Sequence, residues 1–249
     1  MLNKTKIKYI QSLSHKKQRD QDSVFVAEGP KIIKELLDEK NIKLKELFAT
    51  KEFLNLNPGI VSQQAFAITE ISEDELRKIS FLSTPKQVLG IFQKPAFPEF
   101  SRPEGITIVL ETIQDPGNMG TIIRCSDWFG IKNIICSKDS VDIFNPKVVQ
   151  STMGSIGRVQ VIYCDPVELL NNFSNIPVLA ATLKGRPVSS IKTPSNCFLI
   201  IGNESKGISK PLLEKVNTEI TIPGRGKAES LNAGVATGII LSWLTNEPI

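Results

Sequence analysis

The sequence predicts an α/β protein in two parts: a small N-terminal α/β unit and a second half built on a parallel sheet. Three observations support this fold class. Strand-like and helix-like segments alternate along the chain. Strand candidates such as FLII are continuously apolar, as expected when helices cover both faces of a parallel sheet. A proline-rich stretch with Pro95, Pro98 and Pro103 separates the two parts, because such a run fits neither a helix nor a central strand.

The first part is expected to contain four short strands. They are the β-prone segments Val24–Val26, Leu47–Ala49, Ala65–Ile68 and Val88–Phe92. A helix is indicated by an apolar stripe at helical spacing, formed by Ile32, Ile33, Leu36 and Leu37. Ser72 and Glu75 have the spacing of a capping box, which predicts a second helix carrying Leu76 and Ile79.

The second part is expected to contain six strands with helices between most of them. The strand candidates are Ile106–Leu110, Asn133–Cys136, Arg158–Tyr163, Val178–Ala181, Phe198–Ile201 and Glu219–Ile222. A last helix is predicted from about Ser230 to Trp243. We therefore divide the chain into a first domain (1–94), a linker (95–105) and a second domain (106–249).

Charge is unevenly distributed between the two parts. The net charge is +4, with 16 Lys/Arg and 12 Asp/Glu in residues 1–95 but 14 of each in the remainder. All of the positive excess therefore lies in the first part. Lys16, Lys17 and Arg19 belong to a basic N-terminal cluster that can attract phosphate. An ordinary solvated helix face remains the alternative interpretation.

Composition excludes several kinds of chemistry. His15 is the only histidine, so Ser-His-Asp or Cys-His catalysis would depend on this one residue, and no metal site is expected. The cysteines lack metal-ligand or redox spacing and are interpreted as small buried residues; they are Cys125, Cys136, Cys164 and Cys197. No apolar run approaches the roughly 18 residues of a membrane span, and no signal peptide is present, so the expected location is cytoplasmic.

Ligands of open α/β sheets bind beyond the carboxyl ends of strands, so the glycine-rich loops there are the candidate site. In the first loop, Asn118 is a candidate helix cap, and Arg124 is expected on a largely buried helix that also carries Trp128 and Phe129. The second loop is IGNESKGIS and the third is IPGRGKAESLN. The third is not a P-loop, because Thr221 stands where that motif needs glycine. A G-x-G-x-x-G fingerprint is also missing.

The order and spacing of the three loop motifs identify a protein family more specifically than any single motif does. They read N-x-G-x-x-x-R at Asn118–Arg124, G-N-E-x-x-G at Gly202–Gly207 and I-P-G-x-G-x-A-E-S-L-N at Ile222–Asn232. This set resembles the three motifs of the SpoU/TrmH class of SPOUT RNA 2′-O-ribose methyltransferases, and the resemblance covers the second half. The first part, with KKQRD followed by VFVAEGPKIIKELL, is similar to the family's RNA substrate-binding domain.

The resemblance implies a SPOUT-type parallel sheet with a trefoil knot, S-adenosylmethionine as cofactor, and a homodimer. It implies that backbone groups hold most of the cofactor. The cofactor-binding residues by motif match are Thr182, Gly202, Ile222, Ser230, Leu231 and Asn232. The substrate would be structured RNA, with ribosomal RNA favoured over transfer RNA, and the basic N-terminal cluster would bind its phosphates.

The resemblance also assigns catalysis to Arg124. Because a guanidinium stays protonated, we expect it to bind phosphate and stabilise a developing alkoxide. Asn118 would hold the ribose or orient Arg124, and Glu204 would pair with Arg124 or accept the proton. Gln150 departs from the family pattern, which often has arginine there, so Lys147 or Arg158 would have to replace that RNA contact. The alternatives are a base-directed SPOUT methyltransferase, a non-catalytic RNA-binding protein with this fold, and an unrelated nucleotide-binding enzyme.

Overall fold

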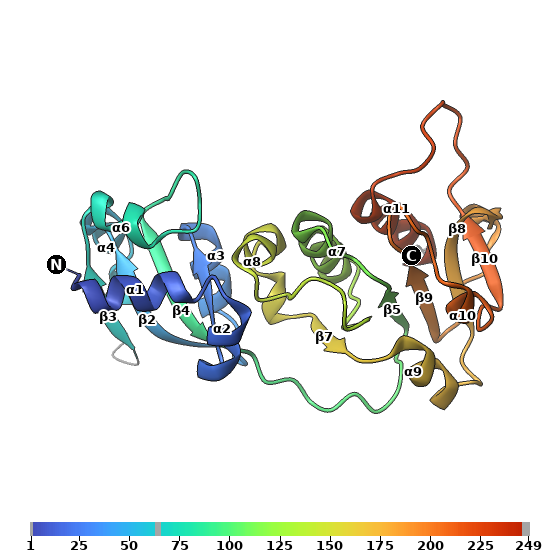
Figure 1. Ribbon diagram of the computed structural model, residues 1–249, viewed down its shortest axis with the longest axis horizontal. Coiled ribbons are helices and arrows are strands. Elements are labelled where there is room, and N and C mark those ends of the chain that lie inside the picture. The colour runs from blue at the N-terminus through green and yellow to red at the C-terminus, as the bar shows by residue number, and fades with distance from the viewer. Residues whose placement is uncertain (1, 63–65, 246–249) are drawn as a thin grey trace. The chain divides into compact units, whose positions relative to one another are not determined.

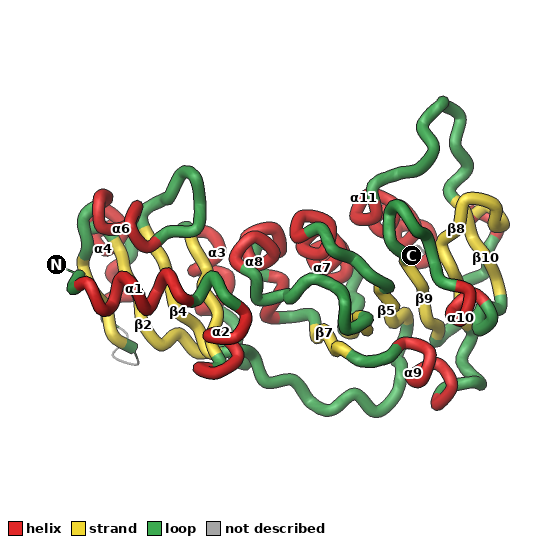
Figure 2. The backbone as a smooth tube through the Cα atoms, in the orientation of Figure 1, coloured by secondary structure: helices red, strands yellow, loops and turns green. Residues whose placement is uncertain are grey.

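The structure is a computed structural model that describes residues 2–62 and 66–245. The chain forms two compact units. Unit 1 comprises Met1–Phe97 and Asp142–Gly157, and unit 2 comprises Pro98–Val141 and Arg158–Ile249. Each unit contains a sheet with helices, which confirms the expected α/β class (Figures 1 and 2). None of the helices in the described part of the chain is long and apolar enough to cross a membrane.

Unit 1 has a four-stranded sheet in the order β1-β4-β2-β3 among its described residues. Strands β2 and β3 are parallel, and the other pairs are antiparallel. Its elements are α1 (Lys4–Ser12), α2 (Lys16–Asp22), β1 (Val24–Glu28), α3 (Pro30–Leu37), β2 (Lys43–Ala49), α4 (Lys51–Leu56), α5 (Pro58–Val61), β3 (Ala67–Glu70), α6 (Glu73–Ile79), β4 (Val88–Gln93), α8 (Pro146–Thr152) and the 3-10 turn η1 (Ser155–Gly157). Strand β3 begins later than expected, and Ala65 lies outside the described residues.

The core of unit 1 forms on the sheet as the apolar patterns predict. One cluster joins α1 and α6 to the strands through Ile10, Leu76 and Leu89. The capping box of α6 is complete, because Ser72 and Glu75 each bond the other's backbone N–H. Gly90 lets α3 approach β4 closely: a Cβ there would lie 2.9 Å from the Cδ1 atom of Ile33.

Arg19 is buried in unit 1, which corrects the expectation that it faces solvent. The residue is 1% exposed, and its side chain donates hydrogen bonds to the carbonyl oxygens of Leu13 and Ser14. It also forms an ion pair with Asp142 at 2.5 Å. A buried guanidinium needs such partners, because an unpaired buried charge is strongly destabilising. Arg19 is therefore unavailable to phosphate in this structure.

The segment Asp142–Gly157 packs on unit 1 although it follows the first strands of unit 2 in sequence. The ring of Phe144 lies 5.3 Å from that of Phe25 in β1, and the Lys94 ammonium lies 4.7 Å from the centre of the Phe144 ring. The Asn41 side-chain amide donates to the carbonyl of Gly157. These contacts, together with the Arg19 ion pair, hold both ends of the segment.

Unit 2 has a six-stranded sheet in the order β10-β8-β9-β5-β6-β7 among its described residues, and all its strand pairs are parallel. Its elements are β5 (Ile106–Leu110), α7 (Pro116–Trp128), β6 (Asn133–Cys136), β7 (Gln160–Tyr163), α9 (Pro166–Asn172), β8 (Val178–Pro187), the 3-10 turn η2 (Val188–Ser190), β9 (Cys197–Ile201), α10 (Lys210–Leu213), β10 (Thr218–Thr221) and α11 (Ala233–Thr245). The last helix starts three residues later than expected, so Ser230–Asn232 belong to the preceding loop.

Helices cover both faces of the unit 2 sheet, which explains its continuously apolar strands. Leu170 of α9 and Leu212 of α10 pack on one face with Phe198. Helices α7 and α11 lie together on the other side of the strands (Figure 1). They approach closely at Gly234, where a Cβ would lie 2.8 Å from the Cγ2 atom of Thr121.

Candidate active site

Three loops that carry the sequence motifs leave the same edge of the unit 2 sheet. Leu110 of β5 pairs with Ile201 of β9 and with Cys136 of β6, so these strands end level with one another. Because the strands are parallel, the loops that follow their carboxyl ends meet at this edge. The loop between β10 and α11 projects from the unit beside α11 (Figures 1 and 2).

The first loop enters α7 with Asp115, and not Asn118, as the N-cap. The Asp115 side chain accepts a hydrogen bond from the backbone N–H of Asn118, and Pro116 occupies the first helical position. Proline is favoured at that position, so the helix begins earlier than Asn118. The Asn118 amide is therefore free of the capping role expected for it.

The Asn118 side chain instead joins the other two loops. Its Nδ2 donates to the carboxylate of Glu204 in the second loop. Its Oδ1 accepts from Asn232 Nδ2, at the end of the third loop, at 2.6 Å. Asn232 in turn caps α11 by accepting from the backbone N–H groups of Gly234 and Val235. One residue of each motif thus meets in a single polar network.

Further residues at this edge were not anticipated from the sequence. Asn203 donates to the carbonyl of Thr112 at 2.8 Å and accepts from the N–H groups of Ser205 and Lys206. The hydroxyl of Thr112 donates to Asp139 at 2.7 Å. Asn203 follows the motif glycine and could have been suspected, whereas nothing in the local sequence singles out Thr112.

Strand β8 contributes a buried hydroxyl with no hydrogen-bond partner among the described residues, Thr182 Oγ1. Ala180 pairs with Ile200, so Thr182 follows at the same sheet edge as Gly202. The β8–β10 register jumps between Glu219 and Ile220, and the chain around Thr182 falls in that irregularity. An orphaned hydroxyl at this edge fits the chemistry of a polar ligand such as S-adenosylmethionine.

Gly202 is required by its own loop. A Cβ there would lie 2.5 Å from the carbonyl oxygen of Gly207 and 2.7 Å from Ile208. Any side chain would displace Gly207, so a substitution at Gly202 disturbs the loop as well as a ligand. In the third loop, Ile222 is half-buried, whereas Ser230 and Leu231 are exposed.

Arg124 and Trp128 are exposed, which corrects the expectation of a largely buried helix. Trp128 is 84% exposed and lies one turn beyond Arg124 on α7. Arg124 lies about 9 Å along the helix axis from Asn118. The structure therefore brings Asn118, Glu204 and Asn232 together but does not bond Arg124 to them.

The cysteines were expected to be buried, and the structure agrees for only two of them. Cys136 and Cys197 are buried, but Cys125 and Cys164 are partly exposed. Burial raises the pKa of all four thiols, that of Cys197 to about 11. None is therefore a thiolate nucleophile at neutral pH. Among the described residues, no group of three or more His, Cys, Asp and Glu side chains could hold a metal ion.

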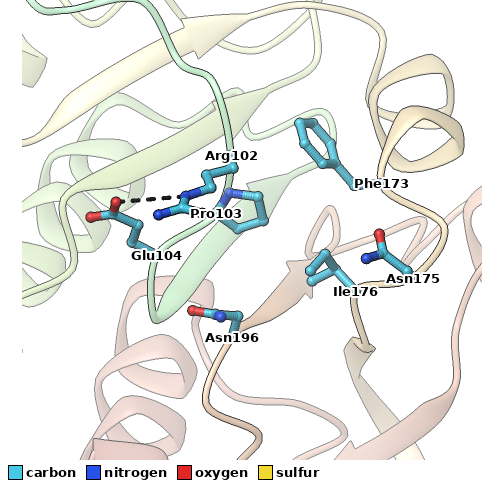
Figure 3. Close-up of a pocket in the computed structure, with 7 residues that line it drawn as sticks. All are labelled: Arg102, Pro103, Glu104, Phe173, Asn175, Ile176 and Asn196. Carbon is cyan, nitrogen blue, oxygen red and sulfur yellow. Dashed lines mark ion pairs between the residues drawn. The ribbon is translucent and has the colours of Figure 1, made fainter.

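A hollow of about 440 Å³ in unit 2 lies away from this site. Asn196 lies just before β9 and accepts from the backbone N–H of Gly105, just before β5. The hollow is therefore at the amino ends of the strands, at the edge opposite to the loop motifs. Its lining residues, drawn in Figure 3, are Arg102, Pro103, Glu104, Phe173, Asn175, Ile176 and Asn196.

Comparison with known families decides the identity of this fold. The profile of the SpoU rRNA Methylase family matches residues 105–242, more than half of the chain. The chain belongs to the SpoU rRNA methylase family. It is an S-adenosylmethionine-dependent RNA 2′-O-methyltransferase, and the family resemblance of its sequence motifs is confirmed. Residues 4–90 match the MRM3-like substrate binding domain.

Individual relatives span nearly the whole chain. The 23S rRNA (guanosine(2553)-2′-O)-methyltransferase RlmP of Bacillus subtilis is 30% identical, over 96% of this chain and 95% of its own. A TrmH-family protein from Porphyromonas gingivalis is 35% identical with a TM-score of 0.85, covering 98% of both chains. The AdoMet-bound rRNA methyltransferase from Sinorhizobium meliloti is 29% identical with a TM-score of 0.84, covering 98% of this chain and 95% of its own.

Proposed function

We propose that this enzyme methylates ribosomal RNA, with Asn118, Glu204 and Arg124 as its catalytic residues. The observation that carries the proposal is the Asn118 network, which unites one residue from each motif loop. The substrate class rests on the full-length similarity to RlmP, whose name gives 23S rRNA as its substrate. Transfer RNA remains the second substrate class.

The cofactor is proposed to lie among the three loops. Bound there, S-adenosylmethionine supplies a methyl group already activated on a sulfonium. Thr182 would give it a hydrogen bond from its unpaired hydroxyl. The remaining contacts, many through backbone, would come from Gly202, Ile222, Ser230, Leu231 and Asn232. In the family this loop arrangement includes a trefoil knot, and we extend that expectation to this chain.

The catalytic residues would divide the handling of the ribose proton and charge. A 2′-hydroxyl is a poor nucleophile at neutral pH, so a group must take its proton as it attacks. The Glu204 carboxylate is oriented by the Asn118 amide, which suits it to accept that proton. The Arg124 guanidinium is exposed and would bind the adjacent phosphate and neutralise developing negative charge.

Substrate binding and assembly complete the proposal. We assign RNA substrate binding to residues 1–94 and methyl transfer to residues 106–249, joined by the linker 95–105. Lys16 and Lys17 are exposed on α2 and would bind RNA phosphate, whereas Arg19 is removed from that role by its burial. Lys147 or Arg158 would make the RNA contact of the arginine that the family often has where this chain has Gln150. The active form would be a homodimer in the cytoplasm.

The test is transfer of a labelled methyl group by the purified protein to separate pools of ribosomal and transfer RNA, followed by nucleoside analysis. We expect label in ribosomal RNA, on the ribose 2′-oxygen. Glu204→Gln should lower the rate by orders of magnitude, in the range typical for a general base. Glu214→Gln, at an exposed residue after α10, is the matched control and should keep the wild-type rate.

Each contrary result points to one alternative. Label on a nucleobase would establish a base-directed enzyme. Label confined to transfer RNA would replace the substrate class. RNA binding without any methyl transfer by the wild-type protein would support a non-catalytic RNA-binding protein.

A further inference from the structure

Thr112, two residues after the end of β5, has a backbone conformation that a threonine rarely adopts. Its φ is +55°, in the left-handed region that favours glycine. The residue is β-branched, which makes this conformation more unfavourable still. Such strain persists only when the surroundings over-determine the conformation, and it concentrates at functional sites.

The surroundings of Thr112 do over-determine it. Its backbone N–H donates to the hydroxyl of Ser137 at 2.8 Å, and its own hydroxyl donates to Asp139 at 2.7 Å. Both partners follow β6. Its carbonyl accepts from Asn203, which follows β9, at 2.8 Å. All three polar groups of Thr112 are therefore bonded to the ends of the two neighbouring strands.

The residues bonded to Thr112 adjoin the catalytic network on both sides. Asn203 directly precedes Glu204. Its Oδ1 accepts hydrogen bonds from the backbone N–H groups of Ser205 and Lys206, the two residues after Glu204. In the other direction, Thr112 lies three residues before Asp115, the cap of the helix that carries Asn118. Thr112 thus connects the two loops whose side chains meet in the Asn118–Glu204 hydrogen bond.

We propose that Thr112, through its hydroxyl bond to Asp139, is a positioning residue that sets Asn118 and Glu204 in register for methyl transfer. This inference rests on the catalytic roles proposed above for those two residues. Thr112 itself touches no reacting atom in this scheme. Its left-handed backbone turns the chain from β5 toward α7, and the hydroxyl holds that turn in place.

The electrostatics of Asp139 support this role. The hydroxyls of Ser137 and Thr112, in that order, hold the pKa of Asp139 below its usual range. The carboxylate is therefore ionised at neutral pH and accepts both hydrogen bonds, at 2.6 Å from Ser137 Oγ and 2.7 Å from Thr112 Oγ1. Hydrogen bonds to a charged acceptor are stronger than those between neutral groups.

The experiment compares Thr112→Val, which keeps the branched shape and removes the hydroxyl, with Thr112→Ser, which keeps the hydroxyl. We expect Thr112→Val to lower the single-turnover rate at saturating S-adenosylmethionine on the order of tenfold, which corresponds to a barrier change of about 1.4 kcal/mol. Thr112→Ser should restore most of the rate. Cofactor affinity and melting temperature should change little. Thr69→Val, in β3 of unit 1, is the matched loss of a threonine hydroxyl.

The outcomes separate this inference from the catalytic assignment. Wild-type turnover in Thr112→Val, together with an inactive Asn118→Ala, overturns only the positioning role. An equal loss in the serine and valine variants also overturns it, because the hydroxyl would not be responsible. A lower melting temperature with an unchanged rate per folded molecule would make Thr112 merely structural. A fully active Asn118→Ala would instead refute the catalytic assignment itself.

Discussion

Arg124 keeps its charge in solvent, on a helix whose opposite side is buried in unit 2. An exposed guanidinium needs no protein partner, so its hydrogen-bonding groups are available to a phosphate. The positive charge of Arg124 would act when the 2′-oxygen becomes negative. It would therefore stabilise the transition state and not the bound cofactor. Loss of Arg124 should therefore affect the turnover rate much more than the affinity for the cofactor.

We expect Arg124→Ala to lose methyl transfer by orders of magnitude while S-adenosylmethionine binds almost normally. Arg124→Lys distinguishes two versions of the role, because a point charge replaces an electrostatic effect but not a bidentate phosphate clamp. Single-turnover methylation and calorimetric cofactor affinity measure both quantities. Arg77→Ala, an exposed arginine of α6, is the control. Near-wild-type turnover in Arg124→Ala would remove this residue from the mechanism.

Helix α2 presents its basic residues in two different environments. Lys16 and Lys17 are exposed, but Arg19 is turned into unit 1 and bonded to Asp142. The helix is therefore both part of the core and a candidate phosphate contact. Only its exposed lysines can release counterions when RNA binds.

We expect the double variant Lys16→Ala/Lys17→Ala to bind RNA more weakly, because two phosphate contacts are lost. The slope of log affinity against log salt should flatten by about one to two units. Filter binding over a salt series measures both effects, and cofactor affinity should stay constant. Lys51→Ala/Lys86→Ala removes the same charge elsewhere in unit 1. An equal effect in this control would mean that net charge, and not α2, binds the RNA.

Helices and strands were predictable where periodicity and composition carry the information. Strands β5 and β6 have the expected bounds, because their apolar runs end at the polar residues Glu111 and Ser137. Helix α7 starts earlier than an Asn118 cap predicts. Asp115 followed by Pro116 was the better signal, since proline favours the first helical position.

The candidate site was predictable in outline but not in its connections. Parallel strands imply that their loops share an edge, so the meeting of Asn118, Glu204 and Asn232 follows from topology and motif order. The left-handed φ of Thr112 and its hydrogen bond to Asn203 could not be predicted, because side-chain periodicity contains no information on the sign of φ. The burial of Arg19 and the exposure of Arg124 could not be predicted from the sequence either. They depend on which distant segment covers each helix.

Large apolar side chains are exposed on both α7 and α11. Trp128, Val235 and Trp243 are all at least half exposed on these two helices, which pack against each other. Two exposed tryptophans and a valine on neighbouring helices are typical of a surface that another protein covers. A second copy of the chain, related by twofold symmetry, would cover them.

We expect light scattering at micromolar concentration to give twice the chain mass of 27.5 kDa. The double variant Trp128→Lys/Trp243→Glu should shift the protein toward the monomer, because charges would be buried at the interface. Leu56→Lys, at an exposed leucine of unit 1, should leave the mass unchanged. A wild-type mass near 27.5 kDa would contradict the homodimer.

The packing of Asp142–Gly157 on unit 1 affects how the chain folds as the ribosome makes it. Domains generally fold as units, the N-terminal one first, during synthesis. Here the partner of Arg19 and the helix α8 that packs on β1 are translated only after β5, α7 and β6 of the other unit. The first unit must therefore wait for Asp142 before its buried arginine is neutralised and for Gly157 before its last segment is complete. By then the sheet of the second unit has already begun to emerge.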